Sequence, residues 1–273
     1  MSPDISLQSF LAPHFPKMNT GKRLFFASDF HLGAPNADKS RRRELDIIDW
    51  LEQIRPEAAA IVLVGDIFDF WYEYRHVIPK GFVRFQGKLA ELSDAGIPIA
   101  FFTGNHDMWM QRYFWEELGI PVYRQPQSLH IANQKLYIGH GDGLGPGDYT
   151  YKLLKRVFEN RLARWLFSRL VHPDWGVGLA LFWSRSSRAR NQKKGEEQFM
   201  GEKEWLWQYC RSLEQTNPHD WYIFGHRHLP LDLPVGTQSR YINLGEWLHH
   251  YTYASYDGQQ VHLQTFEPVS VAS

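Results

Sequence analysis

Short apolar runs alternate along the first part of the chain with segments that carry apolar residues at helical spacing. Branched and aromatic runs of this length are typical of strands buried on both faces, here over 23–28, 58–64 and 97–103. The segments between them predict amphipathic helices over 40–54 and 82–95, and Gly96 follows the second as a helix-ending residue. The alternation of strand and helix predicts a layered α/β fold.

The period changes in the second part of the chain. A helix is expected over 108–118, followed by an antiparallel hairpin of 128–132 and 135–138 around a turn at Asn133 and Gln134. Further strands are expected over 221–224, 241–244, 251–256 and 260–266. We therefore interpret residues 1–20 as a loose lead-in and 21–273 as one domain. A basic, aromatic-rich helical cap is inserted in that domain at about 149–215.

Composition restricts the partners and the compartment. The formal net charge is zero, so no global field favours nucleic acid. The single Cys210 excludes an intramolecular disulfide framework and suits a reducing compartment. There is no continuous apolar leader at the N-terminus and no apolar run long enough to span a membrane. We expect a soluble cytosolic protein, with peripheral contact at the inner membrane face left open and no indication of its oligomeric state.

Five of the predicted strands end in polar residues of metal-ligand type. Asp66, which follows the buried strand 58–64 and Gly65, is the central one. The complete set contains Asp29, His31, Asp66, Asn105, His106, His140, His226 and His228. Each motif taken singly is compatible with a turn or a surface pair, but five in succession at strand ends predict a metal site at one edge of the sheet.

The ligand types indicate which metals and which chemistry to expect. Imidazole, carboxylate and amide groups without a thiolate suit Mn²⁺, Fe²⁺ or Zn²⁺. Without His106, seven of these residues remain as candidate ligands, which is too many for one ion, so we expect two divalent ions that share Asp66. Two ions roughly 3.5–4 Å apart can bind both the attacking and the leaving oxygen of a phosphoryl displacement.

The order of the motifs resembles the calcineurin-like metallophosphoesterase superfamily. The matching series is Asp-x-His, Gly-Asp-x-x-Asp, Gly-Asn-His-Asp, Gly-His-Gly-Asp and Gly-His-x-His, from Asp29 to His228. The resemblance implies a β-sandwich flanked by helices. It also implies one metal on Asp29, His31, Asp66 and His228, and the other on Asp66, Asn105, His140 and His226. His106 would then be the catalytic histidine, Asp107 would orient it, and Mn²⁺ would be the first expectation for both ions.

Within that superfamily, the cap resembles the UDP-2,3-diacylglucosamine hydrolase branch of lipid A synthesis. That branch cleaves the pyrophosphate to give UMP and 2,3-diacylglucosamine 1-phosphate. The implied partner is an anionic nucleotide-lipid, and the implied substrate-binding residues are Asp148, Ser187, Asn191 and Lys194. The chain departs from the branch at His106, where an arginine is usual, and at Arg227 in the last motif, where a threonine is usual.

Two other functions are kept as alternatives. A metallophosphoesterase acting on a soluble nucleotide or another phosphoester would share the metal site, but it would not need an apolar cap. A non-catalytic metal-binding scaffold would be indicated by a missing ligand, and each motif position carries one. Arg41, Arg42 and Arg43, at the start of the 40–54 helix, belong either to a solvated face or to contacts with an anionic substrate.

Overall fold

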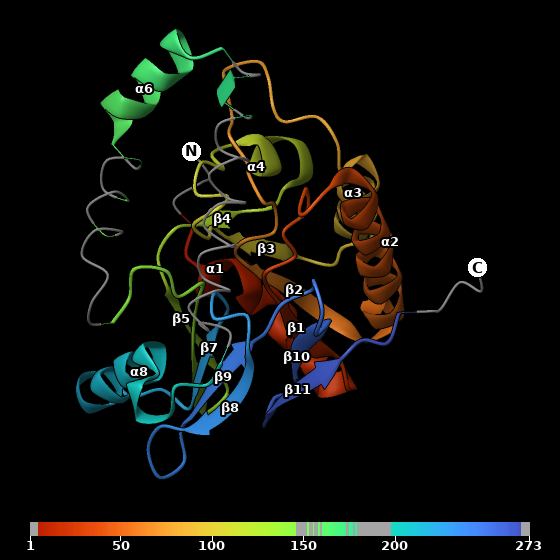
Figure 1. Cartoon of the computed structure of the whole chain (residues 1–273). Helices are drawn as coiled ribbons and strands as arrows, with labels where there is room; N and C mark the ends of the chain where they lie inside the picture. Colours follow the sequence, from red (N-terminus) through yellow and green to blue (C-terminus); the bar gives the residue numbers. More distant parts are fainter. Residues whose placement is uncertain are drawn as a thin grey trace.

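The computed structural model of the chain contains two β-sheets that pack face to face. It describes residues 5–145, 152, 155, 158, 160–172, 175, 176, 178 and 198–268. One sheet has six strands in the order β11-β10-β1-β2-β3-β4, and the other has five in the order β5-β6-β7-β9-β8. Figure 1 shows the helices outside them, with α2 and α3 beside the first sheet and α8 beside the second. The predicted α/β sandwich flanked by helices is confirmed.

The six-stranded sheet is mixed. Its strands β1, β2, β3 and β4 run parallel to one another, whereas β10 is antiparallel to both β1 and β11. Its strands are β1 (Arg23–Ala27), β2 (Ala58–Val64), β3 (Ile99–Phe102), β4 (Val122–Tyr123), β10 (Thr252–Tyr256) and β11 (Val261–Thr265). The helices among them are α2 (Ala37–Ile54), η2 (Arg55–Glu57), α3 (Val83–Asp94) and α4 (Tyr113–Leu118).

The five-stranded sheet begins with the predicted hairpin. Strands β6, β7 and β9 are parallel, and β5 and β8 are the antiparallel edges. Its strands are β5 (Gln127–Ile131), β6 (Gln134–Gly139), β7 (Trp221–Phe224), β8 (Pro230–Pro234) and β9 (Arg240–Leu244). Between β6 and β7 lie α6 (Arg161–Leu170), η3 (Gly201–Lys203) and α8 (Trp205–Thr216).

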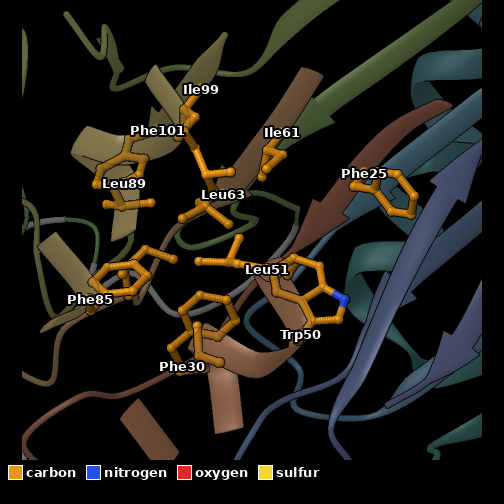
Figure 2. Packing of buried hydrophobic residues seen from close by; sticks show 14 of the residues in the cluster. Phe25, Phe30, Trp50, Leu51, Ile61, Leu63, Phe85, Leu89, Ile99 and Phe101 are labelled. Atoms are coloured by element: carbon orange, nitrogen blue, oxygen red, sulfur yellow. The ribbon is translucent and has the colours of Figure 1, made fainter. Parts of the chain in front are cut away.

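Alternating side chains of the buried strands fill two apolar layers. Phe25, Ile61 and Leu63 face α2 and α3, where they pack with Trp50 and Phe85 (Figure 2). Their sequence neighbours point the other way, so residues such as Phe26 and Val62 contact the facing sheet through Ile138 and Ile223. This period of two explains why strands buried on both faces appear as continuous apolar runs.

The N-terminal segment is part of the core, so the prediction of a loose lead-in is wrong for its described residues. They form α1 (Leu7–Leu11) and η1 (Ala12–Thr20). Leu7 and Leu11 are fully buried against the inter-sheet layer. Gln8 exchanges two hydrogen bonds with the backbone of His130 on β5.

The end of the predicted cap also belongs to the main domain. Helix α8 buries Leu206 and Cys210 against Tyr222, Phe224 and Tyr241 on the outer face of the second sheet. The two ends of the insertion meet here, because a Cβ placed on Gly145 would lie 2.9 Å from the carbonyl oxygen of Trp205. The insertion therefore starts and finishes at one point of the sandwich.

Candidate dimetal site

The ligand-type side chains lie where strands of both sheets end. Asp29 and His31 follow β1, Asp66 follows β2, and Asn105 and His106 follow β3. The second sheet supplies His140 after β6, and His226 and His228 after β7. The parallel strands end at the same edge of their sheets, so five separate segments converge on one place.

The first group contains Asp29, His31, Asp66 and His228, whose ligand atoms all lie within 4.8 Å of one another. The Nε2 atoms of His31 and His228 are 3.0 Å apart, and His228 Nε2 is 3.1 Å from Asp29 Oδ1. His31 Nε2 also lies 3.8 Å from Asp66 Oδ2. Two imidazole nitrogens and two carboxylates therefore surround one point, as a cation site requires.

The second group contains Asp66, His140 and His226. His140 Nε2 lies 3.4 Å from Asp66 Oδ2, while its Nδ1 lies 2.9 Å from the carbonyl oxygen of Val64. That carbonyl can only accept, so Nδ1 donates and Nε2 is the nitrogen that faces Asp66 and would bind a metal after losing its proton. Asp66 belongs to both groups, which is the arrangement expected of a bridging ligand.

The donor atoms fit a divalent cation. Asn105 Oδ1 and His140 Nε2 are buried and have no hydrogen-bond partner among the residues that the structure describes. Buried polar atoms without partners are costly, so their presence here fits a site that binds a cation. The set contains nitrogen and oxygen donors and no thiolate, as Mn²⁺, Fe²⁺ or Zn²⁺ accept.

His106 and Asp69 form a pair beside the first group. His106 Nδ1 lies 3.1 Å from the carbonyl oxygen of Asp69 and 3.6 Å from its Oδ1. Asp69 Oδ1 also lies 3.5 Å from His31 Nδ1. Asp69 is thus the acidic residue next to the catalytic candidate, a position that the sequence-based interpretation had given to Asp107.

Asp107 instead holds the loop backbone together. Its Oδ1 accepts from the Gly104 amide at 2.7 Å, and its Oδ2 accepts from the amides of Ile67 and Phe68 at 2.8 and 3.3 Å. The carboxylate is fully buried and joins the loop after β3 to the loop after β2. The prediction that Asp107 orients the His106 ring therefore gives way to a role in fixing both loops.

Burial and close charges shift the pKa values in this site. Burial lowers the pKa of His140, but the Asp66 carboxylate outweighs it and raises this pKa to about 10. His31 behaves alike, because Asp29 and Asp69 overcome burial and raise its pKa to about 9. The neighbouring histidines hold the pKa of Asp66 well below its usual range despite burial. Before a metal binds, protons on His31 and His140 balance the carboxylates, so metal binding would displace protons.

The ligand-bearing backbone is left-handed at five non-glycine residues. The φ angles are 58° at Asp29, 44° at His31, 51° at Asp66, 66° at His226 and 55° at His228. Residues other than glycine seldom adopt this region, and such outliers concentrate at functional sites. The turns direct consecutive ligands, such as His226 and His228, into one small volume.

Gly104 of the Gly-Asn-His-Asp motif marks the closest backbone approach. A Cβ at this position would lie 2.2 Å from Asp66 Oδ1 and 2.6 Å from the Asp66 amide nitrogen. The next amide but one, that of His106, donates to the same Oδ1 at 2.8 Å. The glycine is thus required because the β3 loop packs directly on the bridging carboxylate.

Two buried arginines support the site, and the sequence did not assign this role to either of them. Arg43 is 4 % exposed and donates to the carbonyl oxygens of Phe30, His31 and Ala34 at 2.6 Å each. It fixes the His31 loop, so it belongs neither to a solvated face nor to a substrate contact. The signal was its position among the buried apolar residues of α2.

Arg227, between the two ligands of the last motif, pairs with Glu204. Its Nε lies 2.5 Å from Glu204 Oε1 and its Nη2 lies 3.1 Å from Oε2. Arg227 Nη2 also donates to the carbonyl of Gln198 at 3.3 Å. Arg227, which departs from the branch pattern, thus connects the loop of His226 and His228 to the segment that leads from the insertion into α8.

An aromatic cluster adjoins the metal loops on the side of His106. We define it as Phe70, Tyr72, Trp109, Phe158 and Phe167. Phe70 and Trp109 have ring centroids 5.7 Å apart, and Trp109 lies 5.4 Å from Phe158. The ring centroid of Phe167 on α6 lies 5.0 Å from that of Tyr72, so the cluster connects the cap to the loops that follow β2 and β3.

The predicted substrate-binding residues Asp148, Ser187, Asn191 and Lys194 lie outside the described residues. Of the helices that the structure describes, none is long and apolar enough to cross a membrane.

Comparison with known proteins places this site in a family. The calcineurin-like phosphoesterase profile matches residues 22–230. The chain is 39% identical over 261 residues to the UDP-2,3-diacylglucosamine hydrolase of Porphyromonas gingivalis, with 90% of this chain and 98% of that protein covered. It is 26% identical over 242 residues to the hydrolase of the same name from Edwardsiella ictaluri, with 87% and 90% covered.

Among solved structures, the chain is similar to the phosphoesterase Yfce from E. coli. The identity is 17%, the TM-score is 0.41, and 90% of this chain and 100% of that chain are covered. The likeness is too distant to carry an argument about function. The family profile spans the converging ligand motifs, and on that basis the chain belongs to the calcineurin-like phosphoesterase family.

Proposed function

We propose that this phosphoesterase hydrolyses UDP-2,3-diacylglucosamine to UMP and 2,3-diacylglucosamine 1-phosphate in lipid A biosynthesis. The observation that carries the proposal is the 39% identity to a hydrolase of that name along 98% of its length. The ligand groups that share Asp66 support the chemistry, because a two-metal centre suits displacement at phosphorus.

The first ion would be held by Asp29, His31, Asp66 and His228, and the second by Asp66, Asn105, His140 and His226. We propose Mn²⁺ for both, as hard carboxylate and amide oxygens favour it beside imidazole. When bound, such ions polarise the phosphoryl oxygens and lower the pKa of water. The Asp66→Asn variant should lose both metal and activity; retention of two ions, measured by elemental analysis, would contradict the bridging role.

The protein's own groups would handle the proton of the leaving oxygen. The Asp69 carbonyl beside His106 Nδ1 directs that ring N–H inward, so Nε2 is the nitrogen available to the substrate. His106 would bind or protonate the leaving oxygen from there. Asp107 would keep the two loops that carry Asp66 and His106 in register through its three amide contacts.

The apolar half of the substrate would lie toward the aromatic cluster and the cap. Phe167 brings α6 against Tyr72 and Trp109. On the same helix, Leu162, Trp165, Leu166 and Leu170 are between 41% and 77% exposed. Exposed apolar groups in a basic segment favour peripheral contact with an anionic membrane. Asp148, Ser187, Asn191 and Lys194 remain our proposed contacts to the sugar and phosphates.

The test is a hydrolysis assay with Mn²⁺ on three substrates: UDP-2,3-diacylglucosamine, UDP-N-acetylglucosamine and bis-p-nitrophenyl phosphate. We expect UMP to be released from the lipid substrate far faster than from the sugar nucleotide. Cleavage of the generic diester or of the soluble nucleotide alone would reject the lipid substrate and keep the phosphoesterase chemistry. Metal-loaded protein that cleaves none of the three would favour the scaffold alternative.

A further inference from the structure

The start of the insertion contacts two of the loops that carry site residues. Lys155 Nζ lies 2.6 Å from Asp142 Oδ2, and Asp142 is the second residue after the metal ligand His140. Three residues further on, the carbonyl oxygen of Phe158 accepts a hydrogen bond from Trp109 Nε1 at 3.0 Å. The insertion is therefore attached to the loop after β6 and to the loop after β3 before α6 begins.

The pair of Lys155 and Asp142 is largely shielded from solvent. The side chain of Asp142 is 6% exposed and that of Lys155 is 20% exposed. Lys155 Nζ also lies 3.4 Å from the carbonyl oxygen of Asp142. On the same segment, Lys152 Nζ donates to the carbonyl of Gly145 at 2.6 Å. A charge-assisted contact in this environment is stronger than a pair on an open surface, so it can hold the insertion against the loop.

Both members of the pair line a cavity that reaches the metal site. The cavity has a volume of about 400 Å³, and His140, Leu144 and Lys152 also line it. One part of its wall belongs to the loop after β6 and another to the insertion. The separation of the two, which the Lys155–Asp142 pair fixes, therefore determines the shape of the cavity. Its volume is in the range of small-molecule sites.

The loop that contacts Lys155 is fixed on the sandwich by other contacts. The amide of Gly225, which precedes His226, donates to the carbonyl of His140 at 3.1 Å. A Cβ on Gly141 would lie 2.9 Å from Leu206 Cδ2 on α8, so the loop and that helix are in close contact. The loop therefore keeps its place without Lys155, whereas the position of the insertion depends on the pair.

We propose that Lys155 is a positioning residue, which holds the insertion beside the metal site through Asp142 and thereby determines which substrates are cleaved efficiently. The inference rests on the proposed function, because it takes the preferred substrate to be one that contacts the insertion. Lys155 is not among the proposed metal ligands. Its loss should therefore affect substrates that contact the insertion and spare those that need the metals alone.

The first test compares two substrates. Lys155→Met should lower kcat/KM for UDP-2,3-diacylglucosamine on the order of tenfold, the loss expected for one charge-assisted hydrogen bond, and mainly through KM. The kcat/KM for bis-p-nitrophenyl phosphate should change less than twofold, because that diester has no sugar or acyl chain for the insertion to contact. The Mn²⁺ content should stay the same. Lys155→Arg keeps the charge and should retain most of the activity on the lipid substrate.

The second test needs no substrate. Hydrogen exchange of the metal-loaded protein should show the amides of α6 exchanging on the order of tenfold faster in Lys155→Met than in the parent. Lys88→Met is the matched control for both tests. Lys88 has a similar exposure of 15% and a carboxylate of Glu91 at 2.6 Å from its Nζ, but it lies on α3. This control should leave the exchange of α6 and both kcat/KM values unchanged.

Three results would overturn the inference: an equal loss on both substrates, exchange of α6 at the parental rate, or the same loss in Lys155→Arg as in Lys155→Met. Faster exchange of α6 in Lys155→Met, together with a parent that does not hydrolyse the lipid substrate, would reject the proposed function and keep the role of the pair. Lipid hydrolysis by the parent, with parental selectivity and exchange in Lys155→Met, would reject the role of Lys155 alone.

Discussion

At the scale of single residues, the site depends on conformations that side-chain patterns do not encode. Asp29, Asp66 and His228 all have φ between 51° and 58°, where a residue with a Cβ is strained. The motif spacing predicted that these residues converge, but not how the backbone turns to achieve it. Backbone hydrogen bonds between the loops hold these turns, since the Asp29 amide donates to the Gly65 carbonyl at 3.0 Å and the His31 amide donates to that of Asp66 at 2.9 Å.

Gly104 provides a direct test of that close packing. Gly104→Ala should destabilise the protein by more than 2 kcal/mol, a cost of the order seen for overpacking, because its Cβ would overlap Asp66 Oδ1. Metal content should fall with it. Gly87→Ala is the matched control: it lies in α3, and its Cβ would contact nothing within 4 Å. Urea denaturation should show a gain of up to about 1 kcal/mol for that control; an equal loss in both variants would contradict the argument.

His106 is the residue whose chemistry can be separated from metal binding. His106→Ala should keep both ions and reduce turnover by roughly 10²–10⁴, the range for one acid–base group. Metal analysis and steady-state rates on the preferred substrate measure the two effects. His130→Ala, at an exposed position on β5, should leave turnover as it is. Turnover of His106→Ala within twofold of the parent would remove this residue from the reaction.

At the scale of elements, the sequence located the buried strands well and the irregular segments poorly. Strands β2 and β7 have the predicted bounds, because continuous apolar runs identify strands buried on both faces. Strand β8 was not predicted, since it is a short edge strand bounded by Pro230 and Pro234. This strand was missed because it lies at the edge of its sheet.

The predicted helix over 108–118 begins five residues later than expected. The Glu73 carboxylate accepts from the backbone amides of Gln111, Arg112 and Tyr113, and so caps α4 from a distant loop. Trp109 meanwhile joins the aromatic cluster. A cap supplied from 40 residues away has no local signal. The partner of His106 was missed for the same reason, because it comes from a different loop. Asp69, in the loop after β2, contacts His106, whereas Asp107 is only its neighbour in sequence.

The Arg227–Glu204 pair predicts a coupling between the metal loop and α8. Either Arg227→Met or Glu204→Leu alone should cost roughly 3–5 kcal/mol of stability, because each leaves a buried charge without its partner. The double substitution should cost much less than the sum. Guanidinium denaturation of the four proteins gives the coupling energy. The exposed pair of Arg240 and Asp232, at a similar distance of 2.6 Å, should couple by less than about 1 kcal/mol, and equal couplings would refute the role of burial.

At the scale of the whole molecule, the metals would join the two sheets. Asp29, His31 and Asp66 follow strands of the first sheet, and His228 follows a strand of the second. Separation of the sheets would therefore disperse the ligands. Metal binding and cooperative unfolding should be linked.

Chelation should lower the melting temperature in a single transition. For each ion present at about 100 times its Kd, the loss is about 2.7 kcal/mol, or roughly 5–10 °C for a chain of this size. Calorimetry with excess Mn²⁺ and with EDTA measures the shift. Asp66→Asn should melt at the same temperature under both conditions; a metal-dependent shift in that variant would show that the ions stabilise the protein elsewhere.

The point at which the insertion leaves and rejoins the sandwich has a consequence for how such enzymes diversify. Gly145 and Trp205 are adjacent in space. Because the entropic cost of closing a loop rises only slowly with its length, the intervening chain can vary in length with little effect on stability. A segment attached in this way can be exchanged for another segment. Lys152, Lys155 and α6 belong to this segment, whereas every proposed metal ligand lies outside it. New substrates could thus be acquired by replacing one stretch of chain, while the hydrolytic centre is inherited unchanged.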